Sequence, residues 1–270
     1  MVKNDVFDFK RLFDYMKIDF FTKNRLWLIG GAAFGGFALI ISGITAFFGF
    51  SGNIHLGFYP VILYLGGFYI SSMAYSEIHM GETSYSYLTL PASTLEKTIG
   101  KVLIYGVGYV VLATGFYVGV SILSEMINKI LFTTTHPVFN PFRWEMMYMI
   151  GFYLAFHTIY LMGSAWFKKH AFIKTFLIII VISLAITLVS LLAFKIVFYE
   201  YFDGWQIKSG PQQIMKHLDT TAAITDIGGL KSRMITLHKV FNAVWKIYFW
   251  GIIPLGGLFG IYFKLKEAEV

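Results

Sequence analysis

The chain has 270 residues, of which 57% are apolar, 19% aromatic and 14% charged, with a net charge of +7 and no cysteine. A soluble domain carries about 25% charged residues, so the composition excludes an ordinary soluble protein. The lack of cysteine excludes disulfides and thiolate metal sites, and basic residues gathered beside apolar runs favour anionic lipid over nucleic acid as their partner.

Residues 1–25 are expected to form a cytoplasmic amphipathic helix on the membrane surface. Apolar side chains recur there at helical spacing while charged side chains occupy the other faces. The uninterrupted apolar core of a cleavable signal peptide is missing. The alternative is a frayed tail that touches lipid. The apolar positions are Phe9, Leu12, Phe13, Met16 and Phe20.

Six apolar stretches follow, each long enough to cross a hydrocarbon layer of about 30 Å. They are predicted to be helices, because no water satisfies backbone amides inside a membrane. The sequence thus predicts an all-α membrane protein with a six-span domain over 26–264 and a tail over 265–270. The predicted spans are 26–50, 54–75, 102–124, 146–167, 172–198 and 241–263.

Lys and Arg concentrate before the first span, between the fourth and fifth spans and in the tail. Because such residues favour the cytoplasmic side, both termini are predicted to be cytoplasmic in a multi-pass protein of the cell membrane, such as the bacterial inner membrane. The loop 199–240 is then extracytoplasmic. It also carries basic residues, but long loops follow the rule less strictly.

Between the second and third spans the chain becomes polar over 76–101. Pro91 interrupts any helix there. Residues 93–96 have the form of a capping box, in which Ser93 accepts from the amide near Glu96 while the Glu96 side chain reaches back to Ser93. A new helix is therefore expected to begin at about Thr94 and to extend into the third span. The side chains expected at the surface before the proline are Tyr85, Tyr87, Leu88 and Leu90.

Four features follow one another along the chain: a basic lead-in, two spans, a polar stretch with Glu82 and Thr83, and the run Leu-Thr-Leu-Pro-Ala-Ser-Thr-Leu-Glu-Lys over 88–97. Their order resembles that in the permease subunits of ABC-2 type transporters. The resemblance is strongest over 76–101 and extends to the number of spans. It implies a coupling helix that rests on a separate cytoplasmic ABC ATPase subunit, and pairing with a second permease copy in a homo- or heterodimer. The residues it nominates for the ATPase-coupling segment are Glu77, Gly81, Glu82, Leu88, Leu90, Pro91, Ser93 and Glu96.

The implied function is a translocation path for export of a lipidic, amphipathic or peptide substrate. The chain carries no phosphate-binding loop of the G-x-x-x-x-G-K-[ST] type and no His-Glu-x-x-His run. It is therefore expected not to be an enzyme and to hold no cofactor or metal, with ATP and magnesium on the partner ATPase. No Asp or Glu falls inside a predicted span, which disfavours an ion-coupled carrier.

Two other functions remain open at this stage. One is a membrane scaffold or assembly protein that binds a cytoplasmic partner through 76–101 without transport. The other is an intramembrane hydrolase with Ser164 as nucleophile, which would need a histidine of another helix within hydrogen-bond reach. The sequence gives no support for that arrangement.

His157 is predicted to lie deep in the fourth span. A histidine there is a functional candidate, although a neutral imidazole that donates to a neighbouring helix is the commoner outcome. Pro60 and Pro254 are expected to bend their spans. Three glycine pairs are expected to let helices approach closely, and they are Gly31 with Gly35, Gly115 with Gly119, and Gly256 with Gly260.

Overall fold

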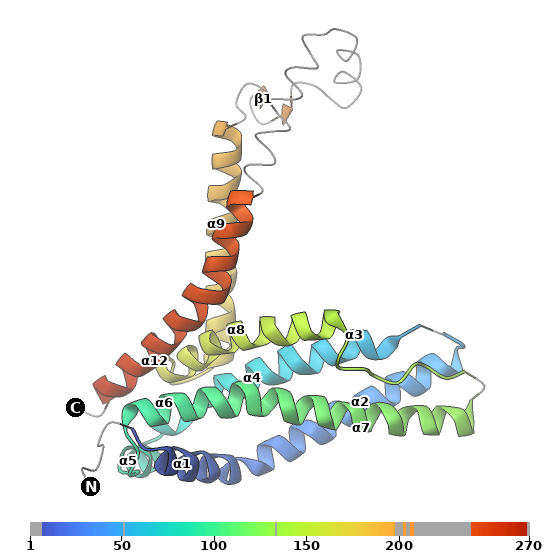
Figure 1. Ribbon diagram of the computed structural model, residues 1–270, viewed down its shortest axis with the longest axis horizontal. Helices are drawn as coiled ribbons and strands as arrows, with labels where there is room; N and C mark the ends of the chain where they lie inside the picture. The colour runs from blue at the N-terminus through green and yellow to red at the C-terminus, as the bar shows by residue number, and fades with distance from the viewer. Residues whose placement is uncertain are drawn as a thin grey trace. The chain divides into compact units, whose positions relative to one another are not determined.

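The computed structural model describes residues 7–50, 52–132, 134–197, 202–203, 206–207 and 239–268, with the backbone alone at Leu26, Glu82, Leu88, 202–203 and 206–207 (Figure 1). The prediction of an all-α membrane protein is confirmed. Six helices are long and apolar enough to cross a membrane, and most of the predicted loop 199–240 lies outside the described residues. The six run over Trp27–Phe47, Ile54–His79, Thr94–Leu131, Trp144–Trp166, Ala171–Ile196 and Lys239–Ala268.

The chain divides into two compact units. The first comprises Met1–Thr175 and Ile252–Val270, and it contains both clusters of polar side chains described below. The second comprises Phe176–Gly251 and contains most of α9 (Ala171–Val197), the most apolar of the six candidate spans. A two-residue antiparallel pairing joins β1 (Phe202–Asp203) to β2 (Gln206–Ile207) in this unit.

A helix, α1 (Phe9–Thr22), is present within the predicted lead-in. The Asp8 side chain caps it by accepting a hydrogen bond from the Lys10 amide at 2.7 Å. The face that packs on the rest of the first unit matches the predicted apolar face in part: Leu12 is buried and Met16 packs against the core, but Phe9 and Phe13 are exposed. The buried side chains are Leu12, Tyr15 and Asp19.

The first span is α2 (Asn24–Phe47), which packs against α7 (Tyr109–Leu131). The fourth is α8 (Trp144–Trp166), which packs against α4 (Gly67–Ser72) and α12 (Ile253–Ala268). Further contacts place the third span beside the second and the fourth in the first unit (Figure 1).

Three of the spans contain a π-helical turn, which the sequence did not predict. The second span consists of α3 (Ile54–Val61), η1 (Ile62–Gly66) and α4, and the sixth has η5 (Tyr248–Ile252) ahead of α12. Pro60 precedes η1 and Pro254 follows η5, so both prolines lie where the helical hydrogen-bond pattern changes. The third span consists of α6 (Thr94–Val102), η3 (Leu103–Gly108) and α7.

Tyrosine hydroxyls bind backbone carbonyls in two of these π-helical turns. The Tyr109 hydroxyl donates to the Ile62 carbonyl in η1 at 2.7 Å, and the Tyr153 hydroxyl donates to the Tyr105 carbonyl in η3 at 2.6 Å. A carbonyl inside a membrane bundle needs a partner from the protein, because water does not reach it. The buried tyrosines therefore satisfy the irregular backbone as well as filling the core.

Candidate functional site

The predicted coupling segment forms two short helices and the capped start of the third span. Its elements are η2 (Ser76–His79), α5 (Gly81–Leu88) and α6. The Glu96 amide donates to Ser93 Oγ at 3.2 Å, and the Ser93 amide donates to Glu96 Oε2 at 2.8 Å. The predicted capping box and helix start at Thr94 are both confirmed.

The residues nominated for coupling differ in exposure. Gly81, at the first position of α5, and Pro91, in the break before α6, are exposed, while Leu90 is half-buried. Glu82 and Leu88 lie in α5, and their side chains are outside the described part of the structure.

The two tyrosines expected at the surface of this segment have opposite environments. Tyr85 is 75% exposed, as predicted, but Tyr87 is only 4% exposed, so the prediction for Tyr87 is wrong. Helical geometry explains the difference, since side chains two positions apart on α5 point to different faces. The face carrying Tyr87 packs inward.

Glu96 connects the beginning of α1 to the beginning of α6. It is fully buried, and its Oε1 accepts hydrogen bonds from the Asp8 amide at 2.6 Å and from Arg11 Nη2 at 2.9 Å. Oε2 makes the capping contact with Ser93. One carboxylate thus serves two helix starts that are 88 residues apart in sequence.

A second internal contact, the Asp19 cluster, consists of Asp19, Lys23, Glu77 and Lys101. Lys101 is fully buried and pairs with Asp19, and its ammonium also donates to the Ala74 carbonyl at 2.7 Å. Lys23 Nζ lies 3.6 Å from Asp19 and 3.2 Å from Glu77. The cluster therefore joins α1, α6, η2 and the Lys23 junction between α1 and α2.

The charges in this cluster compensate one another. Burial opposes ionisation of Asp19, but the Lys101 and Lys23 ammonium groups more than offset it and hold the pKa of the Asp19 carboxyl below its ordinary value. Buried charges are tolerated only when they are paired in this way. The Asp19 carboxylate is thus ionised and paired with the lysines, not protonated.

Aromatic rings surround the buried ammonium of Lys101. The ammonium lies 5.5 Å from the ring centroids of Tyr75 and Tyr87 and 5.7 Å from that of Tyr105, within the range of a cation–π contact. Lys97 lies 5.3 Å from the Tyr87 ring. Tyr87 is therefore an internal partner of two lysines of α6.

Two hollows lie beside these contacts, between α1 and the chain around α5. Their volumes are about 220 Å³ and about 90 Å³. Pockets for drug-sized molecules begin at about 300 Å³, so these hollows match single side chains better. Tyr15, Ile18 and Leu90 line both, and the larger one also reaches Asp19, Glu77 and Tyr87.

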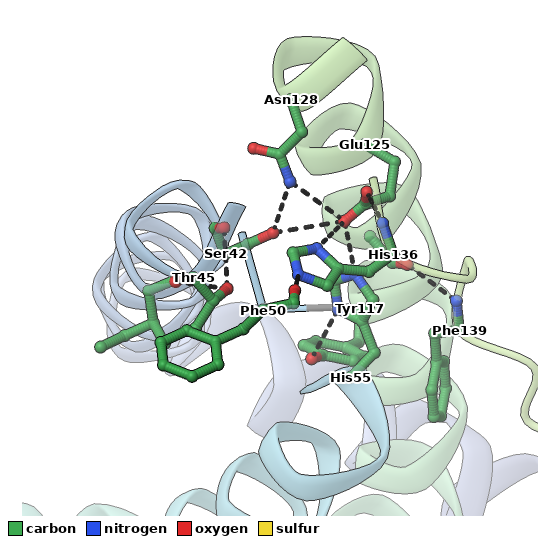
Figure 2. Close-up of polar contacts among 11 residues, drawn as sticks. Ser42, Thr45, Phe50, His55, Tyr117, Glu125, Asn128, His136 and Phe139 are labelled. Carbon is green, nitrogen blue, oxygen red and sulfur yellow. Dashed lines mark hydrogen bonds and ion pairs between the residues drawn. The ribbon is translucent and has the colours of Figure 1, made fainter. Parts of the chain in front are cut away.

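A separate polar site, the Glu125 cluster, lies at the other end of the second and third spans (Figure 2). It comprises Ser42, His55, Glu125, Asn128 and His136, all buried, whose polar groups point toward the Glu125 carboxylate. Oε1 lies 3.0 Å from His55 Nε2 and 3.2 Å from Ser42 Oγ, and Oε2 accepts from the His136 amide at 2.6 Å.

The Glu125 cluster corrects the prediction that no acidic residue lies within a span. The third span was expected to end at residue 124, but α7 continues to Leu131 and places Glu125 inside the helix. The polar residues Ser121, Glu125 and Asn128 recur at helical spacing and are all buried. That stripe was the sequence signal for a polar site.

His157 is buried in the fourth span, but it does not bind a neighbouring helix as expected. Its Nδ1 bonds to the Leu154 carbonyl of the same helix at 2.8 Å, and its ring stacks on Tyr153 at 5.5 Å between centroids. A Cβ added to Gly106 would lie 2.6 Å from His157 Nε2. Gly106 in η3 therefore leaves the space that the imidazole occupies.

Ser164, the nucleophile of the hydrolase alternative, uses its hydroxyl within its own helix. Its Oγ donates to the Leu161 carbonyl at 2.7 Å. The nearby His79 Nε2 bonds to the Ser164 carbonyl at 3.0 Å, not to the hydroxyl. This geometry does not activate Ser164 as a nucleophile.

The glycine pairs contribute unequally to packing. A Cβ at Gly35 would lie 2.8 Å from the Phe116 side chain of α7, so this glycine lets α2 and α7 approach closely. Gly31 faces the same ring, at 3.8 Å. Among the described residues, nothing lies within 4 Å of a Cβ at Gly115, Gly119 or Gly256, while one at Gly260 would overlap Met162.

Gly106→Ala is expected to destabilise the protein by about 1–3 kcal/mol, because the new methyl group collides with the buried imidazole of His157. Gly115→Ala is the matched control in the same span, where the methyl group meets open space. The control should leave stability unchanged or raise it by up to about 1 kcal/mol. Thermal unfolding in detergent measures both, and equal effects would contradict the packing role of Gly106.

Comparisons with known protein families, with characterised proteins and with solved structures find no match to this chain. Among the described residues, no group of three or more His, Asp or Glu is placed to hold a metal ion. The function is therefore inferred from the contacts of Glu96 and of the Asp19 cluster and from the connection of the segment 76–101 to the third span.

Proposed function

We propose that this chain is the permease subunit of an ABC-2 type transporter and that a separate cytoplasmic ABC ATPase subunit binds ATP and magnesium and drives it. The observation that carries the proposal is the connection between an exposed helix and a span. α5 presents Tyr85, and the chain then enters α6, which continues through η3 into α7 (Figure 1).

Force applied to α5 has a short path into the membrane. Leu90 and Tyr87 pack against the core, and the buried Glu96 and Lys101 fix α6 to α1. Because packed and ion-paired elements move together, displacement of this region is expected to move the start of the third span with it. That is the mechanical requirement for a permease powered from outside the membrane.

In this proposal α1 and α5 face the cytoplasm, and both termini lie on that side of the cell membrane, which in a bacterium is the inner membrane. The exposed Phe9 and Phe13 of α1 then contact lipid at the cytoplasmic surface. A second permease copy, identical or different, completes the translocation path. The substrate class that fits an apolar path is lipidic, amphipathic or peptidic, moved outward.

The two hollows beside α5 support a protein partner over a small-molecule ligand. Their volumes suit inserted side chains. Leu90 lines both hollows, the exposed Pro91 lines the smaller one, and α5 carries the exposed Tyr85. Aromatic residues surrounded by small pockets are typical of the centre of protein interfaces. The ATPase is therefore expected to contact α5 and the break that follows it.

Tyr85→Asp is expected to reduce the ATP hydrolysis that co-purifies with the chain from its native membranes at least about tenfold, because a carboxylate buried unpaired at an interface weakens binding by more than about 1.4 kcal/mol. Phe142→Asp is the matched control, since Phe142 is also largely exposed but lies between α7 and α8. It should leave the hydrolysis unchanged.

A photo-crosslinker at position 85 identifies the partner directly. Capture of a P-loop ATPase at position 85 and not at position 142 supports the permease. Capture of a partner that does not hydrolyse ATP would support the scaffold function instead. Equal loss of hydrolysis in Tyr85→Asp and Phe142→Asp would contradict the proposed docking site.

A further inference from the structure

Both ring nitrogens of His136 lie close to oxygen atoms. Its Nε2 lies 2.9 Å from the Phe50 carbonyl oxygen, and its Nδ1 lies 3.3 Å from Glu125 Oε1 (Figure 2). A carbonyl oxygen and an ionised carboxylate oxygen both accept and never donate. When Glu125 is ionised, both ring nitrogens face acceptors, so this geometry favours His136 as an imidazolium.

The other contacts of the cluster fit an ionised Glu125. Tyr117 lies 3.2 Å from His55 Nδ1, so its hydroxyl can donate there while His55 Nε2 donates to the carboxylate. Asn128 donates to Ser42 Oγ at 2.9 Å, and that hydroxyl donates to Glu125 Oε1. In both chains of hydrogen bonds the last donor points to the Glu125 carboxylate. His55 needs only the hydrogen on Nε2 for this, so it can be neutral.

The same contacts hold the connection between α7 and α8 against the bundle. His136 and Phe139 of this connection are both buried. The Phe139 amide donates to Ser121 Oγ at 2.8 Å, and its ring packs on Tyr59 at 4.6 Å between centroids. His136 itself bridges the residue Phe50 beyond α2 to Glu125 of α7.

We propose that the Glu125 cluster is a proton-binding site that controls this connection. A proton on His136 holds residues 134–143 against Phe50, α3 and α7, and loss of the proton releases them. The inference goes beyond the proposed transport function and does not depend on it. In the orientation proposed above, this site lies toward the extracytoplasmic side.

The sign of the pH dependence follows from the acceptors. A neutral His136 keeps one ring hydrogen, so one of its nitrogens would turn a lone pair toward the Phe50 carbonyl or the Glu125 carboxylate. An attractive contact then becomes repulsive, which weakens the hold on the connection. The connection is therefore held at acidic to neutral pH and released as the pH rises.

The groups around His136 add no competing charge among the described residues. The titratable side chains that face it or its partners are Glu125 and Tyr117 from α7 and His55 from α3. The region of α2 contributes the uncharged Ser42 and the Phe50 carbonyl. Lys129, one turn beyond Glu125, is exposed.

Hydrogen–deuterium exchange of the intact chain in lipid nanodiscs tests the proposal across the range of about pH 5 to about pH 8 in which histidines change charge. After correction for intrinsic exchange, amides 134–142 should exchange at least about tenfold faster on the alkaline side, as expected when a charge-assisted hydrogen bond is lost. Side-chain nitrogen NMR should assign the same transition to His136.

His136→Gln and Glu125→Gln should both remove the pH dependence, with fast exchange throughout. His170→Asn is the control, since His170 is exposed and has a φ of 54°, which Asn also adopts readily. It should behave as the wild type. Exchange in α8 reports whether each variant is folded. A pH-independent wild type, or a transition that persists in a folded His136→Gln variant, would overturn the proposal.

Discussion

Asp19→Asn is expected to destabilise the first unit by about 3–5 kcal/mol, because it leaves the fully buried Lys101 without its closest counter-charge. The remaining carboxylate, Glu77, lies 3.7 Å from Lys101 and already pairs with Lys23 at 3.2 Å. Denaturant unfolding in detergent, followed by near-ultraviolet signals from the surrounding tyrosines, measures the loss.

The matched control for this variant is Asp14→Asn on the same helix. Asp14 is exposed, so its change should alter stability by no more than about 0.5 kcal/mol. The double variant Asp19→Asn, Lys101→Met removes both partners, and it should be more stable than the sum of the single variants predicts, by about 1–3 kcal/mol. Additive losses would mean that the pair contributes nothing as a pair.

The architecture of the spans was predictable because a membrane imposes one strong requirement. Each crossing needs about 20 apolar residues with satisfied backbone amides, and such runs are visible in a single sequence. The capping box at Ser93 and Glu96 was predictable for a similar reason, since its contacts lie three residues apart. Both signals are local.

The internal polar clusters were not predictable, because their members come together only in three dimensions. Asp19 and Lys101 are 82 residues apart, and Ser42 and Asn128 are 86 residues apart. The wrong prediction for Tyr87 has the same origin. The Tyr87 ring packs against lysines of α6. The break at Pro91 separates α5 from α6, so the sequence does not define how these two helices lie relative to each other.

The end of the third span was missed because hydropathy underestimates helices that carry a buried polar stripe. Glu125 and Asn128 lower the local hydropathy, yet both face protein partners and not lipid. An ionisable residue inside a span is expected to face the bundle interior and to be paired, as Glu125 is. The same residues that hid the helix end form the proton-binding site proposed above.

Two buried contacts between α6 and α1 give Glu96 a specific role in the proposed coupling. If force from α5 reaches the third span through α6, the contacts that fix α6 to α1 decide whether both helices move together. Glu96 is the contact at the first turn of α6, and Lys101 is the contact near its end. Their side chains leave α6 toward the same helix, α1.

Glu96→Ala is expected to destabilise the first unit by about 3 kcal/mol, because it removes one half of the α6 capping box and takes the carboxylate acceptor from the partly buried Asp8 amide and from the Arg11 guanidinium. Glu96→Gln should cost less, since glutamine can still complete a capping box but loses the ion pair. The difference between the two variants separates helix capping from the connection to α1.

Glu267→Ala is the control for the ion pair itself. Glu267 lies 2.8 Å from Lys264, close to the 2.9 Å of the Glu96–Arg11 pair, but it is exposed. Its loss should change stability by less than about 1 kcal/mol, because exposed pairs contribute little. Thermal unfolding of the three variants compares two ion pairs of similar length, one with a buried carboxylate and one with an exposed carboxylate. If Glu96→Ala were as mild as Glu267→Ala, α1 would not be fixed to α6 by this carboxylate.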